Sequence, residues 1–303
     1  MVLSDSLVPF LYALLCLIWG STWLAIKVGL VGVPPLLGAG LRFLLSTIIV
    51  ACLLAIRGRG IKLTRDDTIC ILTLGLLVFW LDYGLIYWAE TQISSGLTAV
   101  LFSTMPLMTA LLSTFWTGSE TLTVRKVTGI LIGIAGTALL FWPHESLGVM
   151  PALGMLSTLA GCLCAAINLV VIKKYGRHSD GFVLNFFAMA LGALCLLVTS
   201  AALEPWTIVV WTRNNLLAIL YLSVFGSVIA FSVYYHLVKR IDATVVSLQT
   251  LISPVVALAL GRTFLYETVT PAGVVGIVTI LAGVGVATLQ PRTEARVASR
   301  RAP

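Results

Sequence analysis

Three charged side chains fall inside long apolar segments of this sequence and could act on a charged or polar solute: Lys27, Arg42 and Asp82. Arg42 and Asp82 each lie about seven residues, or roughly 10 Å, from the end of a segment. Because a lone charge in a membrane costs at least ~2.5 kcal/mol, the two either form a structural ion pair or act separately. Acting separately, Arg42 would contact a substrate carboxylate, and Asp82, the sole acid expected at depth, would accept a proton. Lys27, one turn from the end of its segment, either snorkels to lipid headgroups or contacts an anionic solute group.

Aromatic side chains form stripes at helical spacing beside these charges. Trp19 and Trp23 share one helical face with Lys27, and Trp19 lies too deep for an interfacial aromatic belt. Such stripes are more often packing than binding, but rings near mid-depth favour the wall of a cavity. Two further stripes are Trp80, Tyr83 and Tyr87, and Ser227, Phe231 and Tyr234.

A set of polar side chains within the apolar segments could orient a small solute. Each could instead bond a neighbouring helix, an interaction worth about 0.6 kcal/mol on average. The set is Thr22, Thr98, Ser103, Thr104, Asn168, Gln249 and Ser253, and Phe102 completes the predicted cavity residues.

Pro106 and Pro254 occupy matching positions in two apolar segments. A proline inside a helix removes one backbone hydrogen bond and kinks the helix. Matching interruptions in two halves indicate a gating or transport site. The alternative is that prolines are simply tolerated in membrane helices, where neighbours satisfy the freed carbonyl.

The composition places these residues in a membrane. The chain is 59% hydrophobic and 10% charged, with a mean hydropathy of +1.05. A soluble domain carries roughly 25% charged residues, so a water-soluble fold is excluded. The net charge of +7 falls in short loops rather than on a basic face, so we expect no nucleic-acid partner. The six cysteines have no disulfide or zinc spacing, and we expect no metal and no cofactor.

Ten apolar segments are long enough to be predicted as transmembrane helices. They cover residues 8–31, 35–56, 68–89, 94–116, 124–142, 150–173, 182–203, 215–237, 243–263 and 270–289. The loops and tail on one side hold Arg57, Arg59, Lys62, Arg65, Arg125, Lys126, Lys173, Lys174, Arg177, Lys239, Arg240, Arg292, Arg296, Arg300 and Arg301. The positive-inside rule therefore predicts an all-α integral membrane protein with both termini in the cytoplasm.

The two halves of the chain repeat one pattern. Residues 87–106 and 235–254 share a start, an end and an apolar pattern at an offset of 148 residues. Each half holds five segments, an odd number, so the second half must cross the membrane in the opposite sense. We therefore predict two inverted repeats, residues 1–147 and 148–290, followed by a basic cytoplasmic tail, residues 291–303.

Several short motifs resemble one family. They are WGSTWLAIK at residues 19–27, the Arg42-Phe43 pair, the two prolines, Glu120 and Glu267, and the glycines of the fifth and tenth segments. The chain resembles EamA-type members of the drug/metabolite transporter superfamily. This resemblance implies ten helices around a central cavity lined by the first, third, fourth, sixth, eighth and ninth, with the fifth and tenth peripheral. It also implies kinship with bacterial exporters of amino acids, including aromatic ones.

These observations predict an exporter of small metabolites, with amino acids as the substrate class, in the bacterial inner membrane. Its partners would be the solute and membrane lipid. Glycines of the fifth and tenth segments permit close helix packing, within one chain or in a homo-oligomer.

A multidrug exporter, for which Asp82 would be the acid, is the first alternative function. An intramembrane enzyme is remote, because His144, His178 and His236 lie at segment ends or in loops, so no catalytic residue is assigned. Energy coupling stays open between uniport and proton antiport.

Overall fold

The computed structural model describes residues 7–58, 62–93, 95–118, 121–140, 149–265 and 271–288. Within these ranges the chain forms helices joined by turns, and no strand occurs among them. Glu120, Glu267, the boundary between residues 147 and 148, and the tail at 291–303 lie outside the described residues.

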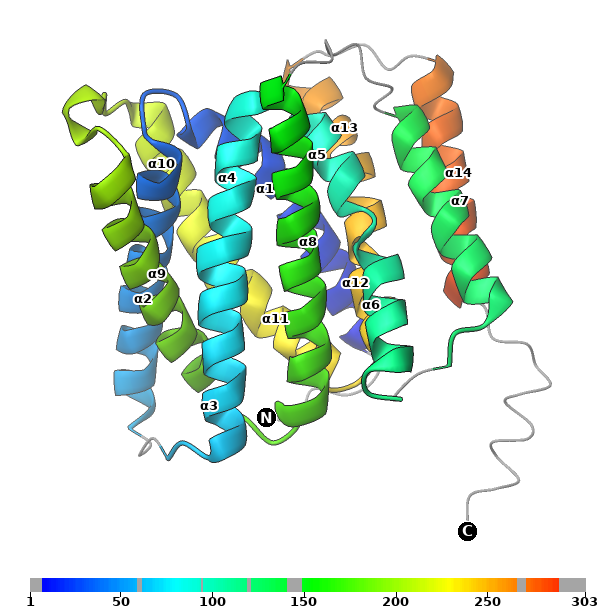
Figure 1. Cartoon of the computed structure of the whole chain (residues 1–303), viewed down its shortest axis with the longest axis horizontal. Coiled ribbons are helices and arrows are strands. Elements are labelled where there is room, and N and C mark those ends of the chain that lie inside the picture. The colour runs from blue at the N-terminus through cyan, green and yellow to red at the C-terminus, as the bar shows by residue number, and fades with distance from the viewer. Residues whose placement is uncertain are drawn as a thin grey trace.

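Helices occupy each of the ten predicted segments (Figure 1). In the first half they are α1 (Val8–Gly29), α2 (Pro35–Arg57), α3 (Arg65–Leu72) continued by η2 (Thr73–Asp82) and α4 (Tyr83–Gln92), α5 (Ser95–Phe102), α6 (Met105–Phe115) and α7 (Val124–Leu140). In the second half they are α8 (Val149–Tyr175), α9 (Gly181–Leu203), the short η3 (Trp206–Ile208), α10 (Arg213–Tyr221) continued by η4 (Leu222–Ile229) and α11 (Ala230–Val238), α12 (Ala243–Ser247), α13 (Gln249–Leu265) and α14 (Pro271–Thr288).

Seven helical runs in the described residues are long and apolar enough to cross a membrane. The prediction of an all-helical, multi-pass membrane protein is therefore confirmed. The other predicted segments hold α7, α12 with α13, and α14, which these seven do not include. The seven runs cover residues 8–29, 35–57, 65–92, 97–115, 149–175, 181–203 and 213–238.

Polar and charged side chains are buried within an otherwise apolar interior, while many large apolar side chains are exposed on the outside. Arg42 and Asn185 are fully buried, whereas Ile56 and Phe115 are 82% and 79% exposed. A large exposed aliphatic or aromatic side chain is stable only where lipid, rather than water, surrounds the helix. The burial pattern thus matches the hydropathy of the sequence.

The third helical run of each half contains a π-helical segment, which the sequence did not predict. These segments are η2 and η4, and they coincide when the chain is shifted by the 148-residue repeat offset. π-helical turns are rare and frequently lie at functional sites, because they widen the helix and leave backbone carbonyls for other donors. In η4, the Ser227 hydroxyl donates to the Leu222 carbonyl and the Gly226 carbonyl accepts from side chains of other helices.

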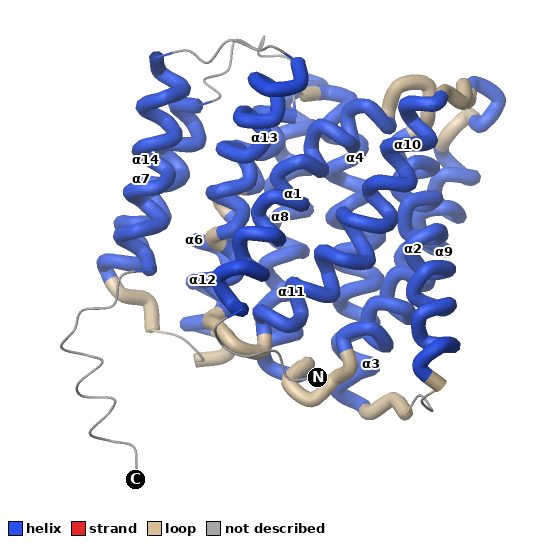
Figure 2. Tube along the Cα trace, turned by 180° about the vertical axis from the view of Figure 1, so that it is seen from behind, coloured by secondary structure: helices blue, strands red, loops and turns tan. Residues whose placement is uncertain are grey.

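The helices form two bundles between two peripheral pairs. α1 packs against α10, η4, α11 and α13, which together are named the α1 bundle. α8 packs against α3, η2, α4, α5 and α6, which are named the α8 bundle. α2 pairs with α9 at one edge of the molecule and α7 pairs with α14 at the other, as Figure 2 shows from behind.

Glycines hold α7 and α14 together within the chain. A Cβ atom built on Gly129 would lie 2.5 Å from the Ala287 nitrogen, and one on Gly136 would lie 2.7 Å from the Ile280 nitrogen. Only hydrogen at these positions permits such close backbone approach. Gly129 and Gly136 of the fifth segment and Gly283 of the tenth thus serve a contact inside one protomer.

Candidate functional site

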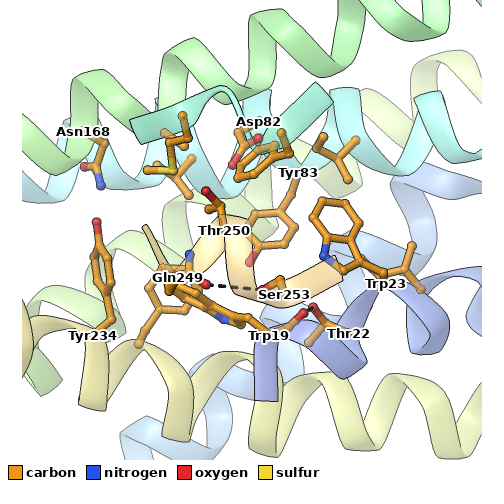
Figure 3. Close-up of a pocket in the computed structure, with 17 residues that line it drawn as sticks. Trp19, Thr22, Trp23, Asp82, Tyr83, Asn168, Tyr234, Gln249, Thr250 and Ser253 are labelled. Carbon is orange, nitrogen blue, oxygen red and sulfur yellow. Dashed lines mark hydrogen bonds between the residues drawn. The ribbon is translucent and has the colours of Figure 1, made fainter. Parts of the chain in front are cut away.

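A cavity lies between the α1 bundle and the α8 bundle, with a volume of about 90 Å³ (Figure 3). Its walls come from α1, the junction of η2 and α4, the break between α5 and α6, α8, α11 and α13. These are the six helical runs that the resemblance implied for a central cavity. The lining residues are Trp19, Thr22, Trp23, Ile26, Val78, Asp82, Tyr83, Ile86, Phe102, Met105, Ala165, Asn168, Phe231, Tyr234, Gln249, Thr250 and Ser253.

Aromatic rings form much of the wall. The Trp19 ring lies 5.4 Å from Phe231 and 5.3 Å from Tyr234, measured between ring centroids. Trp23 faces Phe102 edge-on at 5.7 Å. These separations fall in the range of favourable aromatic pairs, so the rings hold one another in place. The Trp19 indole nitrogen also donates to the Gly226 carbonyl of η4 at 3.3 Å, which ties α1 to the π-helical segment.

A few polar groups interrupt this apolar wall. Asp82 is 4% exposed and lines the cavity, and its Oδ1 atom has no hydrogen-bond partner in the described part of the chain. Asn168 of α8 also lines the cavity, and its Oδ1 likewise has no hydrogen-bond partner among the described residues. The Ser253 hydroxyl donates to Gln249 Oε1 at 3.4 Å (Figure 3). Buried polar groups normally find partners, so unpartnered ones in a cavity wall are sites where a solute can bind.

Arg42 lies behind this wall and is fully buried. Its Nε donates to the Ser227 hydroxyl at 2.9 Å and its Nη2 to the Gly226 carbonyl at 3.1 Å. Its guanidinium lies 4.6 Å from the centroid of the Tyr83 ring, which separates it from the cavity. Between Arg42 and Asp82, both of them described, the structure forms no ion pair.

Lys27 and Glu90 meet at the end of α4, away from the cavity lining. The Lys27 ammonium donates to the Glu90 main-chain carbonyl at 2.6 Å. The Glu90 side chain is fully buried, and neither carboxylate oxygen has a hydrogen-bond partner among the described residues. Glu90 is therefore a second buried acid beside Asp82, which the sequence analysis did not single out. Glu90 lies eight residues after Asp82, a spacing that places both side chains on one broad face of the helix. That spacing could have indicated that Glu90 is buried.

The other predicted cavity residues do not line the cavity. Tyr87 is buried, and its hydroxyl accepts from Arg42 Nη1 at 3.4 Å, while Ser227 bonds Arg42 from η4. Thr104 contacts Cys162 of α8 at 3.6 Å, and Thr98 is buried in α5. Trp80 donates to Thr199 at 3.1 Å and lines a separate groove of about 790 Å³ on the α2–α9 side.

The two prolines sit differently in their helices. Pro106 is in the first turn of α6, directly after a break at Ser103 and Thr104. Pro254 lies inside α13, and the break in that run falls earlier, at Leu248. A proline in a first helical turn leaves no hydrogen bond unmade, whereas an internal one does. The two prolines therefore match in sequence, but the break in the helix lies two residues before Pro106 and six residues before Pro254.

Several lining residues were not predicted. Val78, Ile86, Met105 and Ala165 are apolar, and their sequence positions carry no signal that separates a cavity wall from helix packing. Thr250 follows Gln249 directly, and two adjacent helical residues point in directions about 100° apart. Both reach the cavity beside the turn at Leu248, which the sequence did not predict.

This arrangement, a multi-pass helical protein with a cavity between two bundles of helices, defines a membrane transport protein. The model of the EamA-like transporter family matches residues 7–142 and again residues 152–289. The chain belongs to the EamA-like transporter family.

Similar proteins come from several bacteria. The uncharacterized transporter YoaV of Bacillus subtilis is 28% identical, over 88% of this chain and 92% of that protein. The uncharacterized inner membrane transporter YedA of Escherichia coli K12 is 31% identical, over 84% of this chain and 83% of that protein. A solved crystal structure with 23% identity gives a TM-score of 0.78 over 94% of this chain and 98% of that chain, which establishes a shared fold.

Family and helices together give the coarse function. The chain is a multi-pass transporter of the inner membrane, in a family of transporters rather than enzymes. Its partners are a small-molecule solute and the surrounding lipid.

Proposed function

We propose that this protein exports small metabolites, with amino acids as the substrate class, by alternating access through the cavity between the α1 and α8 bundles. Ten helices cross the membrane as two inverted halves, residues 1–147 and 148–290, and both termini are cytoplasmic. The predicted cavity residues, Asp82 and the two prolines serve this cycle. The observation that carries the proposal is the cavity between the bundles, to which both halves contribute a first, a third and a fourth helical run.

The helix packing supports the inverted arrangement. α1 of the first half packs on the third and fourth runs of the second half, and α8 of the second half packs on the third and fourth runs of the first. In Figure 1 the run from α3 to α4 rises, whereas the run from α10 to α11 descends. Such exchange symmetry is typical of transporters in which one bundle rocks against another.

The basic residues support the orientation. At the lower face of Figure 1, where α2 ends and α3 begins, lie Arg57, Lys62 and Arg65. Lys173 and Lys174 end α8 at that face, and Lys239 and Arg240 follow α11 there. By the positive-inside rule this face is cytoplasmic.

The chemistry of the cavity fits a zwitterion. Asp82 can accept hydrogen bonds from an ammonium group, and bonds to charged groups are worth about 1.5–3 kcal/mol. No basic side chain lines the cavity in the described part of the chain, so a carboxylate would bind a neutral donor such as the Asn168 amide. The aromatic wall would hold an apolar side chain.

A second candidate is export of bulky organic cations, as in multidrug transport. The cavity-lining carboxylate of Asp82, free of an ion pair with Arg42, favours it. The cavity volume of about 90 Å³ disfavours multidrug export, because sites for drug-sized ligands measure about 300–1,000 Å³. A drug-sized cation would need the bundles to separate further.

The experiment is uptake of radiolabelled solutes into liposomes that contain the purified protein. A panel of amino acids and one of organic cations are each measured with and without an imposed pH gradient. Saturable amino-acid flux supports the proposal, and its response to the gradient separates uniport from proton antiport, for which Asp82 and Glu90 are the buried acids. Flux of cations alone would replace the amino-acid assignment with the multidrug one.

A further inference from the structure

Two lysines bond the carbonyl ends of helices at opposite ends of the cavity. Lys27, two residues before the end of α1, donates to the Glu90 carbonyl of α4 at 2.6 Å. Lys173, two residues before the end of α8, donates to the Val238 carbonyl of α11 at 2.7 Å and to the Ile241 carbonyl at 2.6 Å. Carbonyls in the last turn of a helix have no partner within that helix and carry its negative dipole, so an ammonium group is a favourable partner.

The two contacts occupy equivalent places in the two halves. α1 and α8 are the first helices of their halves, and α4 and α11 end the third helical runs. The 148-residue repeat offset places Glu90 on Val238; it places Lys27 on Tyr175, and the two lysines correspond in that each lies two residues before the end of its helix. Because the halves run in opposite directions, the end of α4 lies at the upper face of Figure 1 and the end of α11 at the lower face. One contact therefore stands above the cavity and the other below it.

Each contact also joins the two bundles. Lys27 belongs to α1, while α4 packs with α8, so this bond crosses from the α1 bundle to the α8 bundle. Lys173 belongs to α8, while α11 packs with α1, so the second bond crosses the same boundary in the other direction. The cavity is lined by both bundles and has a volume of about 90 Å³ in this doubly bonded structure. Separation of the bundles at either end requires that the bond at that end breaks.

We propose that Lys27 and Lys173 are the two latches of alternating access: each holds one end of the cavity closed, and each releases its carbonyl partners when that end opens. This inference rests on the proposed transport function but not on the identity of the substrate. The structure with both latches bonded is the occluded state, in which the solute reaches neither side. A ligand or a variant that breaks one latch shifts the population toward opening at that end alone.

The latches differ in number of bonds. Among the described residues, Lys27 donates to the Glu90 carbonyl, whereas Lys173 donates to both the Val238 and the Ile241 carbonyls. The end at Lys27 therefore opens more readily than the end at Lys173. Lys27 bonds the main-chain carbonyl of Glu90, whose side-chain carboxylate is buried. Opening of the cavity at this end therefore also exposes the Glu90 carboxylate to water.

The test measures access to the cavity from each face and needs no substrate. Ser253 lines the cavity and is replaced by cysteine, in a chain whose exposed or half-buried Cys52, Cys164 and Cys195 are replaced by alanine. A membrane-impermeant maleimide is added to right-side-out or to inside-out vesicles. Chains that lack the reporter cysteine give the background labelling.

We expect Lys27→Met to raise labelling from one face by about tenfold, and Lys173→Met to raise it from the opposite face, as a population shift of that size predicts. Lys27→Arg and Lys173→Arg keep a charged donor and retain the labelling of the unmodified chain. If a methionine variant is not monodisperse in detergent, the glutamine variant supplies the same comparison. Unchanged labelling, or a rise from the same face for both lysines, overturns the proposal.

These outcomes are separate from those of the flux experiment. If the two lysine variants raise labelling from opposite faces but no amino acid is transported, the latches are retained and the amino-acid assignment is rejected. Amino-acid flux without labelling changes would retain the transport function and reject the latches.

Discussion

The Arg42 Nε atom donates to the Ser227 hydroxyl at 2.9 Å, which joins the second helix of the first half to the π-helical segment η4 of the second half. The same guanidinium donates to the Gly226 carbonyl, which also accepts from the Trp19 indole nitrogen. One irregular helical segment thus anchors a buried cation from α2 and a cavity ring from α1. This network fixes the aromatic wall before any solute binds.

Arg42→Lys should destabilise the protein. Lysine cannot reproduce the planar fork that bonds Ser227, Gly226 and Tyr87 together, so an ammonium group would be buried with donors unmet. We expect the free energy of unfolding to fall by about 2–3 kcal/mol, measured by chemical denaturation in mixed micelles. Arg65→Lys is the control, because Arg65 is exposed in the first turn of α3 and should change stability by less than about 0.5 kcal/mol. Equal losses for both variants would contradict the anchoring role of Arg42.

Asp82→Asn should reduce solute flux without unfolding the protein. The variant keeps the size of the side chain but loses the charge that binds an ammonium group, so flux should fall by about tenfold or more in proteoliposomes. If a pH gradient drives transport, the residual flux should no longer respond to it. Asp66→Asn, on the exposed surface of α3, is the control. A rate equal to that of the unmodified protein would remove Asp82 from the site.

Trp19→Ala should lower flux through loss of the cavity wall. The substitution removes ring contacts with Phe231 and Tyr234 and the hydrogen bond to Gly226. We expect at least about a tenfold loss, since about 1.4 kcal/mol of binding energy corresponds to that factor. Trp19→Phe keeps a ring and should retain more flux than Trp19→Ala. Trp116→Ala, at a 53% exposed position, should leave flux unchanged, and an equal loss there would point to a general effect on folding.

Gly129→Ala should weaken the pairing of α7 with α14. The added methyl would lie 2.5 Å from the Ala287 nitrogen and 2.7 Å from the Gly283 carbonyl oxygen, both backbone atoms that cannot rotate away. Overpacking of this kind costs about 1–3 kcal/mol of unfolding free energy. Gly285→Ala is the matched control, because a Cβ there meets no atom within 4 Å. Thermal unfolding in detergent would separate the two, and equal stability would contradict the tight contact.

Much of the fold followed from the sequence because hydropathy marks where a helix can cross a membrane. The run of apolar residues around Trp19 predicts α1, and the shared pattern at residues 87–106 and 235–254 relates α4 through α6 to α11 through α13. The π-helical segments did not follow, because residues 73–82 and 222–229 have the same apolar composition as regular helix. A shift from four-residue to five-residue hydrogen bonding arises from tertiary contacts such as that of Arg42.

The site was predicted where a residue type was unusual for its depth. Trp19, Asp82 and Asn168 are polar or amphipathic residues within apolar segments, and all three line the cavity. Trp80 is equally unusual but turns toward Thr199 and α9, because its helical face depends on the unpredicted π-helical register. Glu90 was missed because it falls at the predicted end of a segment, where acids normally face water. Direction of a side chain, rather than its type, was the missing information.

The most direct test of the central claim, that solutes cross through the cavity between the two bundles, is flux in a chain whose cavity is filled. Ala165 of α8 lines the cavity, and Ala165→Phe places a ring in a space of about 90 Å³, while Leu163→Phe adds a ring on the same helix at a 43% exposed position. Both proteins are reconstituted at equal amounts, and uptake of each solute that the unmodified protein carries is measured. The account predicts that Ala165→Phe abolishes uptake while Leu163→Phe retains it. Undiminished uptake in a folded Ala165→Phe protein would show that the solute takes another path.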